Sequence, residues 1–222
     1  VVLVSGEPGI GKTTLVEAFL QCLESRVHNL RSDGPKPLLS KVRTPDPQPQ
    51  PLDTSMWIGH GQCVEAYGPG EAYLPILEAL GRLGRTLRRG QFTAAFHRHA
   101  PTWLGQLPAL ADPNAREELH RQVAGATQER MLRELCDVLE VLTAEHLFIL
   151  VLEDLQWSDT ATLAWLAAVA RRPDPARLLV IGTYRPMDVI MQSHPLRGLV
   201  QELRVHRLCQ EVRLELLSAN EV

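Results

Sequence analysis

The residues best suited to chemistry form a glycine-rich run near the start of the chain. Residues 6–13 have the sequence GEPGIGKT and fit the pattern G-x-x-x-x-G-K-[ST]. Its glycines let the backbone curl so that successive N–H groups converge on an anion. Lys12 adds a positive charge for the β- and γ-phosphates of a nucleotide, and Thr13 adds a hydroxyl group for Mg²⁺. The residues predicted to bind phosphate are Gly6, Glu7, Pro8, Gly9, Ile10, Gly11, Lys12 and Thr13, with Thr14 as a lesser neighbour.

The segments on either side of this run are those that a phosphate-binding loop requires. Val1 to Val4 is apolar at every position, which is typical of a strand buried on both faces of a parallel sheet. From Thr13 to about Ser25 apolar residues recur at helical spacing. The positive end of that helix would face the bound anion. This context favours a phosphate-binding loop over the alternative, a purely structural glycine turn.

A pair of acidic residues follows the strongest strand signal in the chain. Residues 147–152 are LFILVL, and Glu153 and Asp154 come next. Ligands of α/β sheets bind at the carboxyl ends of the strands, where one carboxylate can hold Mg²⁺ and another can orient or deprotonate a water. We assign Glu153 to the metal and Asp154 to the water. The reverse order would leave no obvious water activator, and a further alternative is that the pair only caps the turn toward Trp157.

A third polar cluster ends the predicted strand 177–183, RLLVIGT. Thr183 or Arg185 could reach a γ-phosphate if this strand lies between the other two. Arg185 offers a planar guanidinium group that suits phosphate oxygens. The alternative is a surface arginine held rigid by Pro186.

The elements that must position these residues alternate between strands and helices along the chain. Such alternation predicts an α/β fold with a mostly parallel sheet. Arg171 and Arg172 end one helix, where they could act on a neighbouring subunit's nucleotide or simply be solvated. The further strands predicted are 57–63 and 211–216, and the further helices are 74–87, short helices within 90–116 broken by prolines, 117–145 and 160–171.

Residues 32–55 differ in composition from the rest of the chain. Six of the sixteen prolines lie between Pro35 and Pro51. Because proline lacks the N–H group that helices and sheets use, we predict a proline-rich, flexible insertion within the domain. A proline-motif ligand site is the alternative interpretation.

The composition indicates a globular chain and excludes several classes of protein. The 222 residues are enough for one sizeable domain, with 45% hydrophobic residues, 22% charged residues and a net charge of −3. These values exclude a disordered acidic tail and a basic nucleic-acid clamp. No apolar run approaches the roughly 20 residues that span a bilayer, and the start lacks the features of a signal peptide. The four cysteines are widely spaced, which favours free thiols, so we expect a cytoplasmic protein without a membrane partner.

Taken in order, the motifs resemble those of the signal-transduction ATPases with numerous domains, the STAND branch of the AAA-like P-loop NTPases. GEPGIGKTTLVEAF is similar to their first motif, LVLEDLQWSD to their acidic strand, and LVIGTYRP to their sensor strand. GQCVEAYGPGEAYLPILEAL is similar to their second strand and helix, so the resemblance covers most of the chain outside the insertion. Two positions depart from the family pattern: Glu153 stands where Asp is usual, and Gln156 where His is common. We expect the longer Glu side chain to affect turnover more than binding.

The resemblance implies a P-loop NTPase core of α/β type over residues 1–222. Its three-layer sandwich would hold a parallel five-stranded sheet of order 5-1-4-3-2, which brings Arg185 or Thr183 near the γ-phosphate. The chain begins at the phosphate strand, and 217–222 would begin a lid that is absent or truncated. We therefore expect weak nucleotide affinity for this chain alone.

The function implied is that of a regulatory switch module in a larger signalling or transcriptional regulator. It would bind ATP or ADP with Mg²⁺ and hydrolyse ATP slowly, with Asp154, Lys12 and Arg185 as catalytic residues and Thr13 and Glu153 at the metal. The alternative is a nucleotide-binding scaffold without turnover. Flanking regulatory domains, homo-oligomerisation on activation and no direct binding of nucleic acid are further expectations. The chain lacks the guanine signal N-K-x-D and an identifiable acceptor pocket for a kinase, which disfavours those two chemistries.

Overall fold

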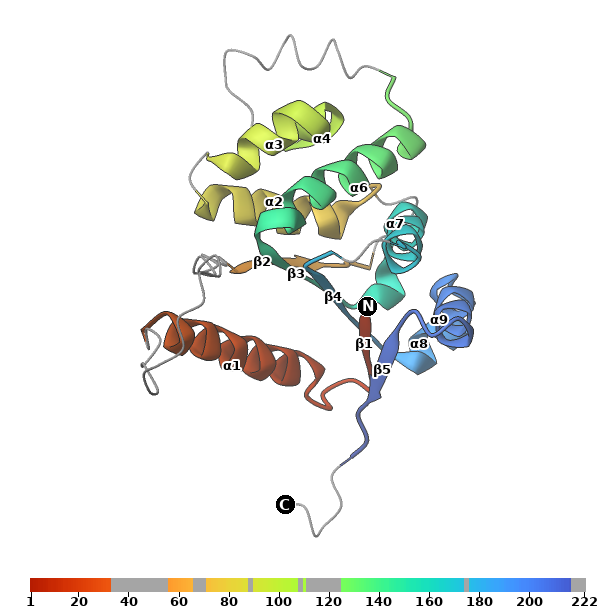
Figure 1. Ribbon diagram of the computed structural model, residues 1–222. Helices are drawn as coiled ribbons and strands as arrows, with labels where there is room; N and C mark the ends of the chain where they lie inside the picture. The colour runs from red at the N-terminus through yellow and green to blue at the C-terminus, as the bar shows by residue number, and fades with distance from the viewer. Residues whose placement is uncertain are drawn as a thin grey trace.

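The computed structural model describes residues 1–32, 56–65, 71–87, 90–107, 110, 125–173 and 176–216. Nearly all of the predicted insertion at 32–55, and the lid start predicted at 217–222, lie outside these residues. Within them the chain alternates strands and helices, as the sequence predicts (Figure 1).

The centre of the fold is a five-stranded sheet in which every pairing is parallel. The strand order is β2-β3-β4-β1-β5, which is the predicted order 5-1-4-3-2 counted from the other edge. Strands buried on both faces need apolar side chains at successive positions, and this explains the unbroken apolar runs in the sequence. The strands are β1 (Val2–Ser5), β2 (Met56–Gln62), β3 (Leu147–Glu153), β4 (Leu178–Tyr184) and β5 (Gln210–Arg213).

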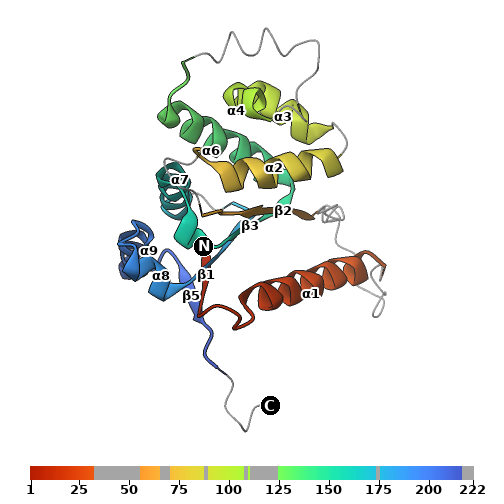
Figure 2. The ribbon, with the colours of Figure 1, turned by 180° about the vertical axis from the view of Figure 1, so that it is seen from behind.

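Helices cover the two faces of the sheet unequally. On one face lies α1, while the other labelled helices lie on the opposite face or beside β1 and β5 (Figures 1 and 2). Successive strand residues alternate between the two layers: Ile149 and Val151 pack toward α1, whereas Leu150 and Leu152 join the larger core. The helices are α1 (Lys12–Ser32), α2 (Leu74–Thr86), α3 (Gln91–His99), α4 (Pro101–Gln106), α6 (Gln128–Glu145), α7 (Thr160–Ala170), α8 (Pro186–Met191) and α9 (Leu196–Val205), with a 3₁₀ turn η2 at Leu155–Trp157.

Helices α2, α3, α4 and α6 lie over β2 and β3 (Figure 1) and contribute to the larger core. Proline fits the first turn of a helix, and Pro101 begins α4 as the predicted helix breaks suggest. Glu134 on α6 is buried and accepts hydrogen bonds from the N–H and hydroxyl groups of Thr102, at 2.8 and 2.9 Å. The indole N–H of Trp103 donates to the carbonyl of Met131 at 2.8 Å. These bonds join α4 to α6 and satisfy polar groups inside the core.

Several elements differ from the sequence-based expectations. The helix expected over 117–145 begins, as α6, at Gln128 after the N-cap Thr127, and α1, expected to end near Ser25, runs to Ser32. The fifth strand was expected over 211–216 but ends at Arg213, because its partner β1 ends opposite it at Ser5 and turns into the loop. Two helices, α8 and α9, were not predicted. Pro186 begins α8, and α9 buries Leu196, Val200 and Leu203, whose spacing is helical but covers few residues.

Two further expectations concern the cysteines and membrane-spanning segments. All four cysteines are free, in agreement with the sequence-based prediction, and burial raises the pKa of the Cys63 thiol to about 12. Among the described residues, the helices are all too short or too polar to cross a bilayer.

The contact between β2 and α2 gives a direct test of this packing. A Cβ atom added at Gly61 would lie 1.8 Å from the carbonyl oxygen of Pro75, a backbone atom that cannot swing aside. Overpacking of a tight core costs about 1–3 kcal/mol, so we expect Gly61→Ala to lower the free energy of unfolding by at least that amount. Urea denaturation measures it. Gly198→Ala, on α9 with open space at its Cβ, is the matched control and should stabilise slightly.

Candidate active site

The predicted phosphate loop connects β1 to α1, and its backbone requires glycine. Gly9 and Gly11 have φ angles of 76° and 96°, a conformation that other residues adopt only with strain. Gly6 lies so close to β5 that an added Cβ atom would be 3.0 Å from the carbonyl oxygen of Leu214. The helix starts at once, since the N–H of Leu15 donates to the carbonyl of Gly11 at 2.9 Å. The amino end of α1 therefore faces the loop, as an anion-binding site needs.

Lys12 is the first residue of α1, and only 8% of it is exposed. Its Nζ donates to the carbonyl oxygens of Gly6 and Glu7 at 2.8 and 2.9 Å, which uses two of its three donors. Burial lowers the pKa of Lys12, and the positive charge of Arg185 lowers it further, while nearby carboxylates act in the opposite direction. A negatively charged ligand at the loop would offset the cost of burying this cation.

Thr13 and Glu153 bring two oxygen donors together from separate elements. The Thr13 hydroxyl, at the start of α1, donates to Oε2 of Glu153, at the end of β3, at 3.3 Å. In the described part of the chain no cluster of three or more His, Cys, Asp or Glu side chains is placed to hold a metal. Mg²⁺ does not need such a cluster, because it keeps several waters and binds one or two protein oxygens together with phosphates. Thr13 and Glu153 fit that requirement.

Asp154 lies at the turn after β3 and forms three hydrogen bonds, one donated by its backbone and two accepted by its carboxylate. Its backbone is left-handed, with φ at 56°, and its N–H donates to the hydroxyl of Thr183 at 3.0 Å. Oδ1 accepts from the amide of Gln156 at 2.9 Å, and Oδ2 from the amide of Gln62 at 3.5 Å. The carboxylate forms no cap on the following 3₁₀ turn. The carboxylate thus contacts the side chains of Gln156 in the turn and of Gln62 at the end of β2.

Arg185 comes directly after β4 and lies between two carboxylates. Its Nε is 3.7 Å from Oδ1 of Asp154, and its Nη1 is 3.6 Å from Oδ2 of Asp188 on α8. Its backbone N–H donates to Oε1 of Gln156 at 3.1 Å. Gln156 is fully buried. Its side-chain N–H donates to Asp154 and its side-chain oxygen accepts from Arg185, so it joins the two residues. Arg185 is a part of this polar network and not an isolated surface arginine.

The sheet brings most of the predicted site residues to one edge. The phosphate loop follows β1, and Glu153 ends β3 with Asp154 next to it. Thr183 and Arg185 flank Tyr184, the last residue of β4, which lies between those two strands. Thr14 is exposed on α1 and forms no hydrogen bond with these groups among the described residues. Arg171 and Arg172 instead pair with Glu202 and Glu140 of their own chain.

Sequence reasoning missed three members of this network: Gln62, Gln156 and Asp188. A signal existed for Gln62, because it ends β2 in register with Glu153 and thus reaches the same edge. Gln156 was noted only as a departure from the family pattern. Asp188 lies on the short α8, which the sequence analysis did not predict.

Comparison with known proteins identifies a family for the chain. The AAA ATPase domain family matches residues 48–181, which is more than half of the chain. The chain belongs to this family. The matched residues run from before β2 into β4 and include the acidic pair, while the phosphate loop lies ahead of them. Neither the curated proteins nor the solved structures gave a match. Membership indicates nucleotide binding, together with the possibility of hydrolysis.

The bond between Asp154 and Thr183 yields a prediction with an internal control. Thr183→Val keeps the shape of this buried side chain but leaves the Asp154 N–H without its acceptor, so we expect a loss of about 1–3 kcal/mol in unfolding free energy. Thr93→Val is the control, because the buried Thr93 hydroxyl has no hydrogen-bond partner in the described residues. It should be neutral or stabilising in the same urea titration. Equal losses in the two variants would show that the Asp154 bond contributes nothing.

Proposed function

We propose that the chain is a Mg²⁺-dependent, slowly ATP-hydrolysing switch core of the STAND type. The observation that carries the proposal is one juxtaposition: the Lys12 loop, the Thr13–Glu153 oxygen pair and the Asp154–Arg185 pair lie at one edge of the sheet. Membership in the AAA ATPase domain family supports nucleotide binding. The resemblance of the three motifs to STAND proteins supports the finer assignment and adenine as the base.

Each charged side chain has a separate task under this proposal. The loop N–H groups and Lys12 bind the phosphates, and Thr13 and Glu153 hold Mg²⁺, whose positive charge would stabilise negative charge on the phosphate oxygens. Asp154 orients the attacking water. Its Oδ1 already has two partners, but Oδ2 has one among the described residues and so keeps a lone pair for that water.

The contacts of Arg185 support slow turnover and a switch. Its guanidinium group lies between Asp154 and Asp188, so turning toward a phosphate would require it to leave at least one of these carboxylates. Electrostatic stabilisation is the main catalytic contribution in phosphoryl transfer, so an arginine held by carboxylates would contribute less and turnover would be slow. A nucleotide that draws Arg185 away would also remove its positive charge from beside Asp154 and Asp188, which couples binding to the arrangement of α8.

Two wider features belong to the same proposal. The module would lie in the cytoplasm beside flanking regulatory domains, and it would form homo-oligomers on activation. Both rest on the STAND resemblance of the phosphate, acidic and sensor motifs. The net charge of −3 supports a role without direct binding of nucleic acid.

A binding-only scaffold is the second candidate, and Glu153 is the observation that favours it. This longer acid stands at the metal position and touches Thr13 directly at 3.3 Å. Such a site could hold Mg²⁺ and nucleotide without placing the water for attack. Nucleotide binding is common to both candidates, and only turnover separates them.

Calorimetry with Mg²⁺ and ATP, ADP or GTP tests nucleotide binding. Lys12→Ala removes a charge aimed at the phosphates, and we expect its ATP affinity to fall by about a hundredfold or more. Arg26→Ala, which removes an exposed cation further along α1, should bind as the wild type does. Equal affinities in Lys12→Ala and the wild type, or a preference for GTP, would contradict the proposal.

Phosphate release tests turnover. Asp154→Asn should keep ATP binding but lose about a hundredfold or more in rate, because an amide cannot take a proton from water. Asp137→Asn, which alters an exposed carboxylate on α6, is the control and should keep the wild-type rate. A wild type that binds ATP but releases no phosphate above the Asp154→Asn rate would establish the scaffold instead.

A further inference from the structure

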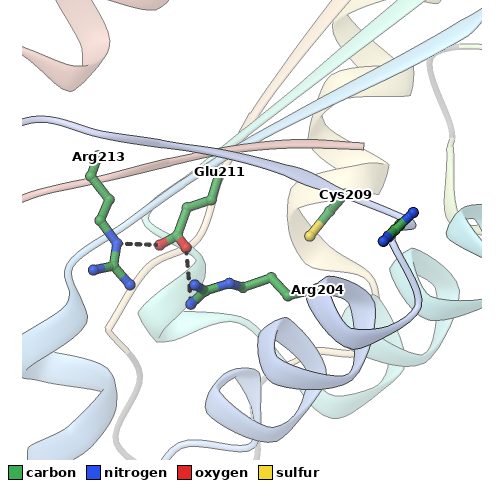
Figure 3. Close-up of a pocket in the computed structure, with 5 residues that line it drawn as sticks. Arg204, Cys209, Glu211 and Arg213 are labelled. Atoms are coloured by element: carbon green, nitrogen blue, oxygen red, sulfur yellow. Dashed lines mark ion pairs between the residues drawn. The ribbon is translucent and has the colours of Figure 1, made fainter.

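Outside the site, one carboxylate joins the two strands that carry the phosphate loop and Arg185. Glu211 lies on β5, and its side chain is 8% exposed. Its Oε1 accepts from the hydroxyl of Ser5 at 3.0 Å and from the hydroxyl of Tyr184 at 2.6 Å. Figure 3 shows the same carboxylate between the guanidinium groups of Arg204 and Arg213, at 3.3 and 3.5 Å. Four side chains therefore converge on one acid.

The two hydroxyl donors occupy the last positions of their strands. Ser5 ends β1 and precedes Gly6 of the phosphate loop, while Tyr184 ends β4 and precedes Arg185. Both residues are buried, at 1% and 6% exposure. The backbone repeats the link, since the N–H of Gly6 donates to the carbonyl of Tyr184 at 3.3 Å. Glu211 thus fixes both strands at the points where the chain enters the site.

The buried hydroxyl bonds dominate this network over the arginine pairs. The side chains of Arg204 and Arg213 are 52% and 65% exposed, and exposed ion pairs contribute little. Burial acts to raise the pKa of Glu211, but the Tyr184 and Ser5 donors and the two arginines together hold it below its ordinary value. Burial and the nearby carboxylate raise the pKa of Tyr184, which keeps its hydroxyl a donor. An ionised acceptor with protonated donors gives strong bonds.

We propose that Glu211 is a positioning residue for the nucleotide site, holding the end of β1 against the end of β4 so that the phosphate loop and Arg185 keep their spacing. The inference rests on the proposed function of that loop. Glu211 forms no hydrogen bond or ion pair with Lys12 or Arg185 in the described part of the chain, and its effect passes through Ser5 and Tyr184. No feature of the sequence around Glu211 indicates this role.

The experiment compares Glu211→Ala with Glu134→Ala, a matched control. Glu134 is likewise a buried carboxylate that binds a hydroxyl group and an arginine, Thr102 and Arg130, but it lies on α6 away from the loop. We expect both variants to lose stability in urea. Only Glu211→Ala should also weaken Mg²⁺–ATP binding, by about tenfold or more. ATP affinity equal to that of Glu134→Ala would overturn the proposal.

Tyr184→Phe keeps the carboxylate and removes one of its two buried hydroxyl donors, so it provides the test if Glu211→Ala does not fold. We expect it to weaken ATP binding about threefold to tenfold. Wild-type affinity in this variant would contradict the proposal as well.

Hydrogen exchange separates this inference from the proposed function. Without nucleotide, Glu211→Ala should speed amide exchange in peptides covering 5–15 and 184–190, whereas Glu134→Ala should not. A wild type that binds no nucleotide would refute the proposed function. Unchanged exchange in Glu211→Ala would refute the positioning role, whatever the wild type binds.

Discussion

The structure depends above all on the parallel alignment of β1, β4 and β3, with β4 in the middle. Parallel neighbours end at the same edge of a sheet, and adjacent strands are about 4.8 Å apart. The phosphate loop after β1 and the acids after β3 are therefore separated by one strand. That strand places Thr183 and Arg185 between them. An order with more strands between β1 and β3 would move the acids away from the loop without changing a single residue of either motif.

The same alignment places opposite charges close together. Lys12 and Arg185 are the cations of the site, and Glu153, Asp154 and Asp188 are its carboxylates. Burial of Lys12 disfavours its charge, and the second cation adds to that cost. Asp154, Glu7 and Asp188 offset part of it, and nucleotide phosphates would offset more.

The helical layer above β2 has a part in the site as well. Because Gly61 lets α2 approach within contact of the β2 backbone, the strand end is held firmly. The next residue, Gln62, donates its backbone N–H to the carboxylate of Glu78 on α2 and its side-chain amide N–H to Oδ2 of Asp154. Packing of α2 is thereby linked to the acid proposed to orient water. Phe92, Phe96 and Trp103 belong to the same hydrophobic core as the buried residues of α2 and stabilise that packing.

The sequence alone determined the local chemistry of this protein. Backbone curl at Gly9 and Gly11, the apolar run of β3 and the acids after it depend on residues within a few positions of one another, so their pattern is visible in the chain. The strand order followed only from the resemblance to a family. The extent of β5 did not follow from its own residues, because it is set by where β1 turns away.

Only the tertiary structure decided which side chains meet. Gln156 gives no sign in the sequence that it will bridge Asp154 and Arg185. Glu211 finds its partner Ser5 at a separation of 206 residues, which becomes a contact only when β5 pairs with β1. Such partnerships depend on chain topology, and no local pattern of polarity or propensity encodes them.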